Sequence, residues 1–259
     1  MVSRTAIALL LLLVSAACGR LGFDEEPGDA GTVPIVDPCP GTALDCAGAV
    51  SCHDFEAGDF DGWGYVCNGD DYQCGPDVAE VELTVVESPP CNGNRVYRAF
   101  TTGGPGSRQN AYLGEYVKDA PVQDLFVRFA LRYPANTNYL GRGIVLAPLM
   151  PSGTKGSPRL ELGDKPGEMR LDLFDQDHVF AAPLAADEWA CIELHLGTAS
   201  ADVWVDGEPV FHLDGPTVPD GAAVDIVTLG ITASASAGPT EIFFDDFALS
   251  TSRIGCVAP

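Results

Sequence analysis

The side chains best suited to contact a ligand fall on two short segments in the second half of the sequence. Ala190–Leu196 and Asp202–Val205 flank a turn-like Gly-Thr-Ala-Ser stretch and can pair as an antiparallel hairpin with Leu196 opposite Ala201. Since side chains alternate between the two faces of a strand, one face of this hairpin is wholly apolar and must be the core. The other face is polar yet includes a tryptophan, and it carries Glu193, His195, Asp202 and Trp204.

Two further segments repeat this division into an apolar and a polar face. Leu125–Tyr133 and Glu168–Phe174 alternate apolar side chains with mostly charged ones. Sugars bind through flat aromatic surfaces, which contact their C–H faces, and through fixed polar groups, which contact their hydroxyls. A convex, solvated sheet whose tryptophan is half covered by a loop would give the same pattern. The ligand-binding prediction comprises Trp204, Glu193, His195, Asp202, Arg128, Arg132, Arg170 and Asp172.

Residues for catalysis are harder to find. Glu193 and His195 could act as an acid/base pair, although neighbouring polar residues on one strand face are commonly structural. The sequence has no Gly-x-Ser-x-Gly elbow, no His-Glu-x-x-His pair and no phosphate loop. We therefore predict a non-catalytic module that binds carbohydrate or another extracellular ligand. A polysaccharide lyase or glycosidase with an atypical site, and a purely structural envelope lipoprotein, remain alternatives.

The elements that position these residues are short strands. From residue 51 to residue 259, apolar runs alternate with Gly, Pro and Asn turns, which is typical of an all-β sandwich or barrel. No long stretch has helical periodicity. The expected strands are Glu80–Glu87, Arg95–Thr101, Leu125–Tyr133, Gly143–Leu149, Arg159–Leu162, Glu168–Phe174, Ala190–Leu196, Asp202–Val205, Ala223–Ala233 and Thr240–Leu249.

Several stretches resemble the concanavalin A-like lectin and glucanase superfamily, and its laminin-G-like members in particular. They are Trp189-Ala190-Cys191-Ile192-Glu193-Leu194-His195, Val203-Trp204-Val205-Asp206-Gly207, Asp54-Phe55-Glu56, Gly62-Trp63 and Ile242-Phe243-Phe244-Asp245-Asp246-Phe247. The resemblance extends from about Cys52 to Cys256. It implies an all-β, two-sheet antiparallel jelly-roll sandwich with one concave sheet and with its terminal strands side by side. It also implies that Cys52 lies near Cys256, and a disulfide between these two is expected.

The enzymes of this superfamily supply two comparisons. Its glucanases use a Glu-x-Asp-x-x-Glu strand, which this sequence lacks. Arg159-Leu160-Glu161-Leu162 loosely resembles the Arg-x-Glu-Leu strand of jelly-roll alginate lyases, but the companion Gln-Ile-His and Tyr-Lys-rich strands are missing. A lyase therefore stays an alternative.

A structural calcium ion is also implied by this resemblance. Related jelly rolls often hold one between an acidic residue of the opening segment and an Asp of the closing strand, and Ca²⁺ takes six to eight oxygen ligands. If the terminal strands adjoin, the carboxylates would repel one another without a cation. On edge strands they could instead point into solvent. The matching positions are Asp54, Glu56, Asp245 and Asp246.

The first residues predict export and lipidation. Arg4 gives a positive start, the apolar run Ala6–Val14 is about half the ~20 residues that a spanning helix needs, and small residues then lead directly to Cys18. This order resembles the lipobox of bacterial lipoproteins, although Ser15 stands where that family usually has Leu. The resemblance implies a lipid on Cys18, and Gly19 after it implies the outer membrane. An ordinary secretory signal with an incidental cysteine is the alternative.

The cysteine count agrees with an oxidising compartment. The chain has nine cysteines; setting Cys18 aside leaves an even number, which suggests disulfides. Zinc is a weaker interpretation because no Cys-x₂-Cys pair exists. The connectivity cannot be deduced from the count alone.

The charge balance excludes some partners. Lys and Arg number 14 against 37 Asp and Glu, for a net charge of −23, so the surface repels nucleic acid and anionic lipid but can attract cations. The predicted organisation is a signal peptide over residues 1–17, a flexible linker over 18–50, rich in Gly, Pro, Asp and Ala, and a β-sandwich domain over 51–259.

Overall fold

The computed structural model describes residues 46–70, 81–87, 94–102, 109–116, 124–137, 158–173, 176–217, 224, 226–234 and 239–256. Within these ranges the regular structure is all β, and no helix is long and apolar enough to cross a membrane. The strands are β1 (Ser51–His53), β2 (Tyr65–Asp70), β3 (Val81–Glu87), β4 (Arg95–Thr101), β5 (Gln109–Tyr116), β6 (Leu125–Arg132), β7 (Arg159–Leu162), β8 (Glu168–Leu173), β9 (Gln176–Ala181), β10 (Ala190–Leu196), β11 (Ser200–Val205), β12 (Glu208–Asp214), β13 (Ile226–Ser234) and β14 (Thr240–Ser250).

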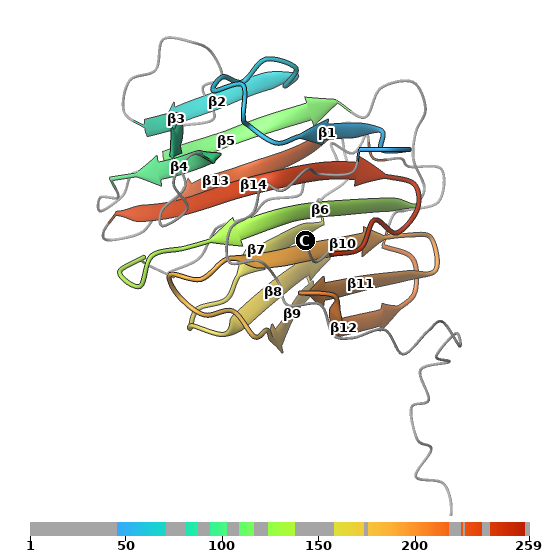
Figure 1. The fold of residues 1–259 in the computed structure, drawn as a ribbon. Coiled ribbons are helices and arrows are strands. Elements are labelled where there is room, and N and C mark those ends of the chain that lie inside the picture. Colours follow the sequence, from blue (N-terminus) through green and yellow to red (C-terminus); the bar gives the residue numbers. More distant parts are fainter. Residues whose placement is uncertain are drawn as a thin grey trace, which may run out of the picture. The chain divides into compact units, whose positions relative to one another are not determined.

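The strands form one large antiparallel sheet and two small ones. The large sheet has eight strands in the order β12-β11-β10-β6-β14-β4-β3, with β1 paired to β14. The small sheets are β13-β5-β2 and β7-β8-β9. In Figure 1 the yellow strands β7, β8 and β9 lie behind the orange strands β10 and β11. The predicted fold class, an all-β antiparallel sandwich with disulfides, is confirmed.

The apolar faces of the sheets share one core. Phe129, Ile192 and Phe244 from the large sheet are fully buried in the same cluster as Leu113 and Leu171 from the two small sheets. Burying a side chain of this size contributes about 1.5–3 kcal/mol. This core fixes which face of each strand points outward.

A buried tyrosine joins the two layers through a polar contact. The Tyr97 hydroxyl on β4 donates a hydrogen bond to the Ala111 carbonyl oxygen on β5, at 3.0 Å, and burial raises the pKa of Tyr97 well above its usual value. Gly230 on β13 lies against both residues with φ +141°, where a Cβ would come within 2.2 Å of the Ala111 oxygen. The close approach of these strands therefore requires glycine at this position.

The predicted strands agree with the observed ones where the alternation is strong. Arg95–Thr101, Arg159–Leu162 and Ala190–Leu196 have the predicted bounds, whereas the segment expected from Ala223 becomes a strand only at Ile226. The expected strand Gly143–Leu149 lies outside the described residues. Among the described strands, β2, β5, β9 and β12 were not predicted, and the opening strand that the resemblance implied near Asp54 is β1, at Ser51–His53.

The hairpin of β10 and β11 has the predicted register. Leu196 pairs with Ala201, His195 with Asp202, and Glu193 with Trp204. Because a slip of one residue would exchange the two faces of β11, this register determines which side chains can form a surface site.

The terminal strands adjoin as predicted, but the expected disulfide is wrong. β1 pairs with β14, and Cys52 lies opposite Ala248. Among the described residues the bridges are Cys46–Cys52 and Cys191–Cys256, each with a Cα–Cα distance of 5.8 Å. Cys256 reaches the start of β10, because the chain leaves β14 and crosses the neighbouring strands, so it does not bond to Cys52.

The residues just before β1 are attached to the sandwich. The Val50 amide donates to the Leu249 carbonyl oxygen at 2.7 Å, and Cys46 is bonded to Cys52. Residues 1–45, which include Cys18 and most of the predicted linker, lie outside the described part of the chain. The side chains of the four other cysteines, Cys39, Cys67, Cys74 and Cys91, also lie outside it.

Candidate functional site

The outer face of the eight-stranded sheet, which points away from the core, gathers most of the predicted ligand-binding side chains. Glu193 on β10 lies between Trp204 on β11 and Arg128 on β6. Arg170 and Asp172 lie instead on β8 in a small sheet, so the prediction of one common face is wrong for these two. Alternation shows which side chains share a face of one strand, but not which sheet that strand joins. The residues on the outer face are Trp204, Glu193, His195, Asp202, Arg128 and Arg132.

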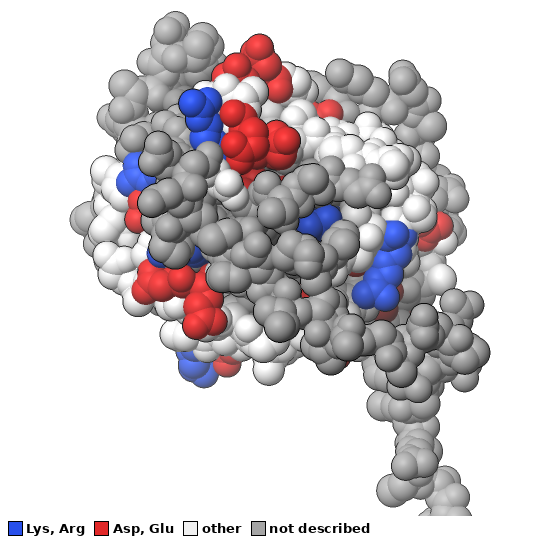
Figure 2. All heavy atoms as spheres, viewed as in Figure 1, with Lys and Arg blue, Asp and Glu red and all other residues white. Residues whose placement is uncertain are grey.

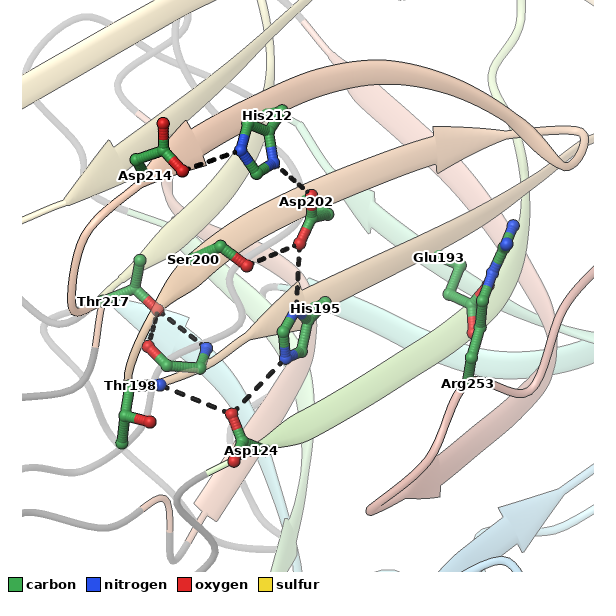
Figure 3. A network of polar contacts seen from close by, with 11 residues as sticks. Asp124, Glu193, His195, Thr198, Ser200, Asp202, His212, Asp214, Thr217 and Arg253 are labelled. Atoms are coloured by element: carbon green, nitrogen blue, oxygen red, sulfur yellow. Dashed lines mark hydrogen bonds and ion pairs between the residues drawn. The ribbon is translucent and has the colours of Figure 1, made fainter. Parts of the chain in front are cut away.

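Alternating carboxylates and imidazoles cross one end of this face, and we call them the polar row (Figure 3): Asp124, His195, Asp202, His212 and Asp214. Asp202 is at the centre. Its Oδ2 lies 3.0 Å from His195 Nδ1, and its Oδ1 lies 2.6 Å from His212 Nδ1. The Ser200 hydroxyl also donates to Oδ2, at 2.9 Å. This carboxylate therefore receives three hydrogen bonds from side chains on β10, β11 and β12.

The outer nitrogens of both imidazoles face further carboxylates. His195 Nε2 lies 3.6 Å from Asp124 Oδ1, and His212 Nε2 lies 3.2 Å from Asp214 Oδ1. Although partial burial acts to raise it, the hydrogen bonds from His195, His212 and Ser200 lower the pKa of Asp202 to about 2. The hydrogen bonds to Asp202 and Asp214 raise the pKa of His212. The row is thus held by charge-assisted hydrogen bonds.

The polar row becomes more open toward its β12 end. The side chain of Asp202 is 19% exposed, that of His212 is 41% exposed and that of Asp214 is 97% exposed. An aromatic surface adjoins the row, because the Phe126 ring stacks on His195 with centroids 4.4 Å apart. The row therefore combines fixed polar groups with a flat apolar surface, as a carbohydrate site needs.

The other half of the outer face is covered by the chain itself, through Thr251–Cys256, which we call the C-terminal strap. Glu193 is fully buried beneath it. Its Oε1 accepts the backbone N–H groups of Ile254 at 2.7 Å and Gly255 at 3.1 Å, and its Oε2 accepts Arg253 Nε at 3.3 Å. The strap therefore satisfies a carboxylate that could not otherwise be buried.

Trp204 is covered by the same strap. The Arg253 guanidinium lies 4.4 Å from the Trp204 ring centroid, close enough for a cation–π contact. Figure 3 shows Arg253 beside Glu193, away from the polar row. Of these two predicted ligand contacts, Glu193 is thus closed to solvent, and Trp204 is partly buried with the Arg253 guanidinium over its ring.

The two predicted arginines of this face make contacts within the protein. Arg128 is almost fully buried, its Nη2 lies 3.9 Å from Asp246 Oδ2, and burial lowers its pKa despite the nearby carboxylates. Arg132 donates to the Asp187 carbonyl oxygen at 3.2 Å and lies 5.4 Å from the Phe243 ring centroid. Both side chains stabilise this face, with little surface left for a ligand.

A separate charged group lies on the outward side of β7 and β8. Arg170 forms an ion pair with the buried Glu161 carboxylate, with its Nε at 3.1 Å, and its Nη1 lies 3.9 Å from Asp177 Oδ2. In the register of β7 and β8, Arg159 lies opposite Asp172. The carboxylate of the Arg-x-Glu-Leu motif is therefore engaged by an arginine.

Four acidic residues lie near the join of β1 and β14, close enough to influence Asp245 electrostatically, and we call them the carboxylate cluster: Asp54, Glu56, Asp245 and Asp246. Asp245 is fully buried. Its Oδ1 accepts the Asp246 backbone N–H at 2.8 Å, while its Oδ2 has no hydrogen-bond partner among the described residues. Burial, followed by the charges of Asp246, Glu56 and Asp54, raises the pKa of Asp245 to about 9.

The carboxylate cluster has the oxygen ligands that a hard cation prefers, but its side chains do not converge on one position. Oxygen ligands and the buried Asp245 Oδ2 suit Ca²⁺. Among the described residues, however, no three His, Cys, Asp or Glu side chains converge on a metal position. Asp54 Oδ1 accepts the Glu56 backbone N–H, and Glu56 Oε1 accepts that of Arg95. The arrangement is therefore not that of a formed metal site, and calcium at Asp54, Glu56, Asp245 and Asp246 stays a prediction.

The described surface carries acidic groups in several places. On the face shown in Figure 2, acidic side chains form separate groups with Lys or Arg beside them. No broad basic patch is visible among the described residues of that face.

The sequence matches no family model and no curated protein. Among solved structures, the chain is similar to an endo-β-1,4-glucuronan lyase from the fungus Trichoderma reesei, with a TM-score of 0.58, 16% identity, and coverage of 79% of this chain and 96% of the lyase. It is also similar to the cellulose-induced protein Cip1, with a TM-score of 0.59, 16% identity and coverage of 80% and 100%. A third similar structure is an alginate lyase from a Chlorella virus, with a TM-score of 0.53, 15% identity and coverage of 78% and 99%.

What these proteins share with the chain is the fold. The likeness extends over nearly their whole length, and it supports the jelly-roll sandwich. Because so few residues are identical, it assigns no site residue.

Sequence reasoning missed three of the five residues of the polar row, Asp124, His212 and Asp214, and it did not predict that the C-terminal strap covers the outer face. His212 and Asp214 alternate within the stretch Phe211-His212-Leu213-Asp214, a weak strand signal that could have been used. Arg253 gave no signal, because it lies in an irregular segment 60 residues from its partner Glu193.

Proposed function

We propose that this protein is a non-catalytic module that binds carbohydrate at the polar row on the outer face of its large sheet. The observation that carries the proposal is the row itself, in which His195, Asp202 and His212 are fixed in one line beside the Phe126 ring. Sugar hydroxyls can both donate to such carboxylates and accept from such imidazoles. The jelly-roll fold, shared with proteins named as polysaccharide lyases, supports a carbohydrate ligand.

The protonation of the row favours binding over catalysis. A general acid needs a pKa near the working pH, whereas Asp202 has a pKa of about 2 and remains ionised. Its oxygens already accept three hydrogen bonds, which leaves acceptor capacity for about one more. Such a carboxylate can orient a sugar but is a poor proton donor.

The charge of the row favours a neutral glycan. It contains three carboxylates and two imidazoles, and the chain carries a net charge of −23, so a uronate polymer would be repelled. Hydroxyl groups incur no such penalty. The ligand therefore differs in charge from the glucuronan and alginate named for the two lyases of similar fold.

The proposal is tested by titrating the purified chain with neutral and uronate oligosaccharides in a calorimeter. Asp202→Asn should weaken binding of a neutral glycan at least about tenfold, since a charged hydrogen bond contributes about 1.5–3 kcal/mol. Glu208→Gln, which removes a carboxylate from the start of β12, should have no effect. Absence of binding by the folded wild-type chain to every neutral glycan contradicts the proposal.

A second candidate function is cleavage of an acidic polysaccharide at the outward side of β7 and β8. The specific observation is the Glu161–Arg170 pair, because an arginine can neutralise the carboxylate of a uronate. A lyase would release unsaturated products that absorb in the ultraviolet from glucuronan or alginate, and Glu161→Gln would abolish them. No absorbance with either polymer excludes this activity for those substrates.

The location and the metal are part of the proposal. A diacylglycerol on Cys18 would anchor the sandwich to the cell envelope, in the outer membrane if the cell has one, because each buried CH₂ contributes about 0.8 kcal/mol. Cys18→Ser should release the protein from the membrane fraction. A calcium ion at the carboxylate cluster would stabilise the join between the terminal strands.

A further inference from the structure

The C-terminal strap is held on the outer face by polar contacts and one covalent bond. Its residues Thr251, Ser252 and Arg253 are exposed, and the rest are only partly buried. Hydrogen bonds to Glu193 and the Arg253–Trp204 contact attach its middle, and the Cys191–Cys256 disulfide fixes its end. Segments with few buried apolar contacts open at low free-energy cost.

The surface beneath the strap has the character of a ligand site. Trp204 offers a flat aromatic face, and Glu193 beside it offers two carboxylate oxygens. In the structure the strap contacts both side chains. The Arg253 guanidinium lies over the Trp204 ring, and two backbone N–H groups of the strap donate to Glu193 Oε1. Because Asp202 of the polar row and Trp204 are two residues apart on β11, their side chains share one face, and this surface continues the polar row.

We propose that the C-terminal strap is a disulfide-fastened cover over a second part of the glycan-binding face, and that opening the Cys191–Cys256 bond exposes Trp204 and Glu193 to a neutral sugar. The sugar would stack its C–H face on the indole ring and donate its hydroxyl protons to the carboxylate. The choice of ligand rests on the proposed function, whereas the opening of the strap does not.

The opening step is a thiol–disulfide exchange with a dithiol reductant. Its thiolate attacks the sulfur of Cys256, a residue that is only partly buried, the Cys191–Cys256 bond breaks, and Cys191 leaves as a thiolate that takes up a proton. The second thiol of the reductant then displaces Cys256. Two electrons pass to the protein, which gains two thiols, and the reductant becomes a disulfide.

The opening is tested by acrylamide quenching of tryptophan fluorescence in the full chain. Replacing both Cys191 and Cys256 by serine should raise the quenching constant about twofold, and adding Trp204→Phe should remove that increase. Replacing Cys46 and Cys52 by serine is the matched control, because it removes a disulfide away from Trp204, and should change nothing. If the double cysteine variant does not fold, a chain that ends at Ser252 serves instead, because it lacks Arg253 and the rest of the strap and should show the same increase in quenching.

Binding is measured in parallel with cellohexaose and laminarihexaose as probes. Opened variants should bind one of them at least about fivefold more tightly than the wild type. Unchanged quenching in the folded opened variants overturns the strap as a disulfide-fastened cover. Increased quenching with unchanged affinity overturns its role in ligand binding. If the strap opens but neither form binds any neutral glycan, the proposed function fails together with the ligand part of this inference.

Discussion

Replacing Asp245 by asparagine gives the sharpest test of the carboxylate cluster. Asp245 is fully buried, its Oδ2 has no hydrogen-bond partner among the described residues, and its pKa is raised to about 9 by burial and by three neighbouring carboxylates. In the metal-free protein at pH 7, the folded state therefore keeps a proton on this group. The unfolded chain, with an ordinary aspartate pKa of 3.8, does not.

The sign and the magnitude of the effect follow from this difference. Because the folded pKa lies above the unfolded one, Asp245 costs nothing below about pH 4, and the fold loses stability as the pH rises from there toward 9. One proton taken up on folding gives a slope of about 1.4 kcal/mol per pH unit. At pH 7 the accumulated cost is about 4 kcal/mol relative to an uncharged side chain of the same shape.

The assay is urea unfolding in EDTA at pH 5, 6, 7 and 8. We expect Asp245→Asn to be more stable than the wild type, by an amount that grows by about 1.4 kcal/mol per pH unit. Glu208→Gln, the same change from carboxylate to amide at an exposed position at the start of β12, is the matched control and should follow the wild type. Histidines that titrate in this range affect both proteins alike, so they cancel in the difference.

Repeating the urea unfolding with calcium in place of EDTA tests the proposed ion independently. An ion at 100 times its dissociation constant stabilises the fold by about 2.7 kcal/mol, and the gain should be larger at pH 8 than at pH 5, because the ion displaces the proton of Asp245. The variant should respond weakly. Parallel pH profiles of wild type and variant would refute the reasoning about Asp245, and an equal calcium response would place the ion elsewhere.

Three further predictions concern other parts of the fold. Gly230→Ala should lower the melting temperature by several degrees, because its Cβ would meet the Ala111 carbonyl oxygen at a positive φ. His212→Gln should reduce stability by less than about 1 kcal/mol at pH 5–6; since the pKa of His212 is raised, the difference should vanish as the pH rises above it, as read from unfolding curves. Glu193→Ala should destabilise the protein by about 2–4 kcal/mol in calorimetry, because it leaves two strap amides and a guanidinium without their acceptor.

The register of β10 and β11 could be predicted because local rules determine it. The turn between the strands is short, and Ile192, Leu194, Val203 and Val205 can share one buried face in only one pairing. The same rules predicted β4 and β7. They failed for β9 and β12, whose side chains are partly exposed on edges of their sheets and whose alternation is correspondingly weak.

The composition of the candidate site could be predicted only in part. Six predicted residues share the outer face because their strands β6, β10 and β11 are neighbours. Arg170 has the same alternation, but β8 lies in another sheet, and sheet membership depends on contacts between strands that a local pattern does not encode. The burial of Glu193 was equally hidden, since its partners belong to an irregular segment about 60 residues away.

The acidic groups of this chain are compensated in three different ways, and the comparison shows where a cation is needed. In the polar row, Asp202 receives two imidazoles and a hydroxyl, which lower its pKa. Under the strap, Glu193 receives two amides and a guanidinium. Asp245 receives one backbone N–H, its other oxygen faces no donor among the described residues, and its pKa is raised. A buried carboxylate with this deficit either takes a proton or binds an ion, so our proposal places calcium at the carboxylate cluster rather than at the polar row, whose carboxylate already has its counter-charges.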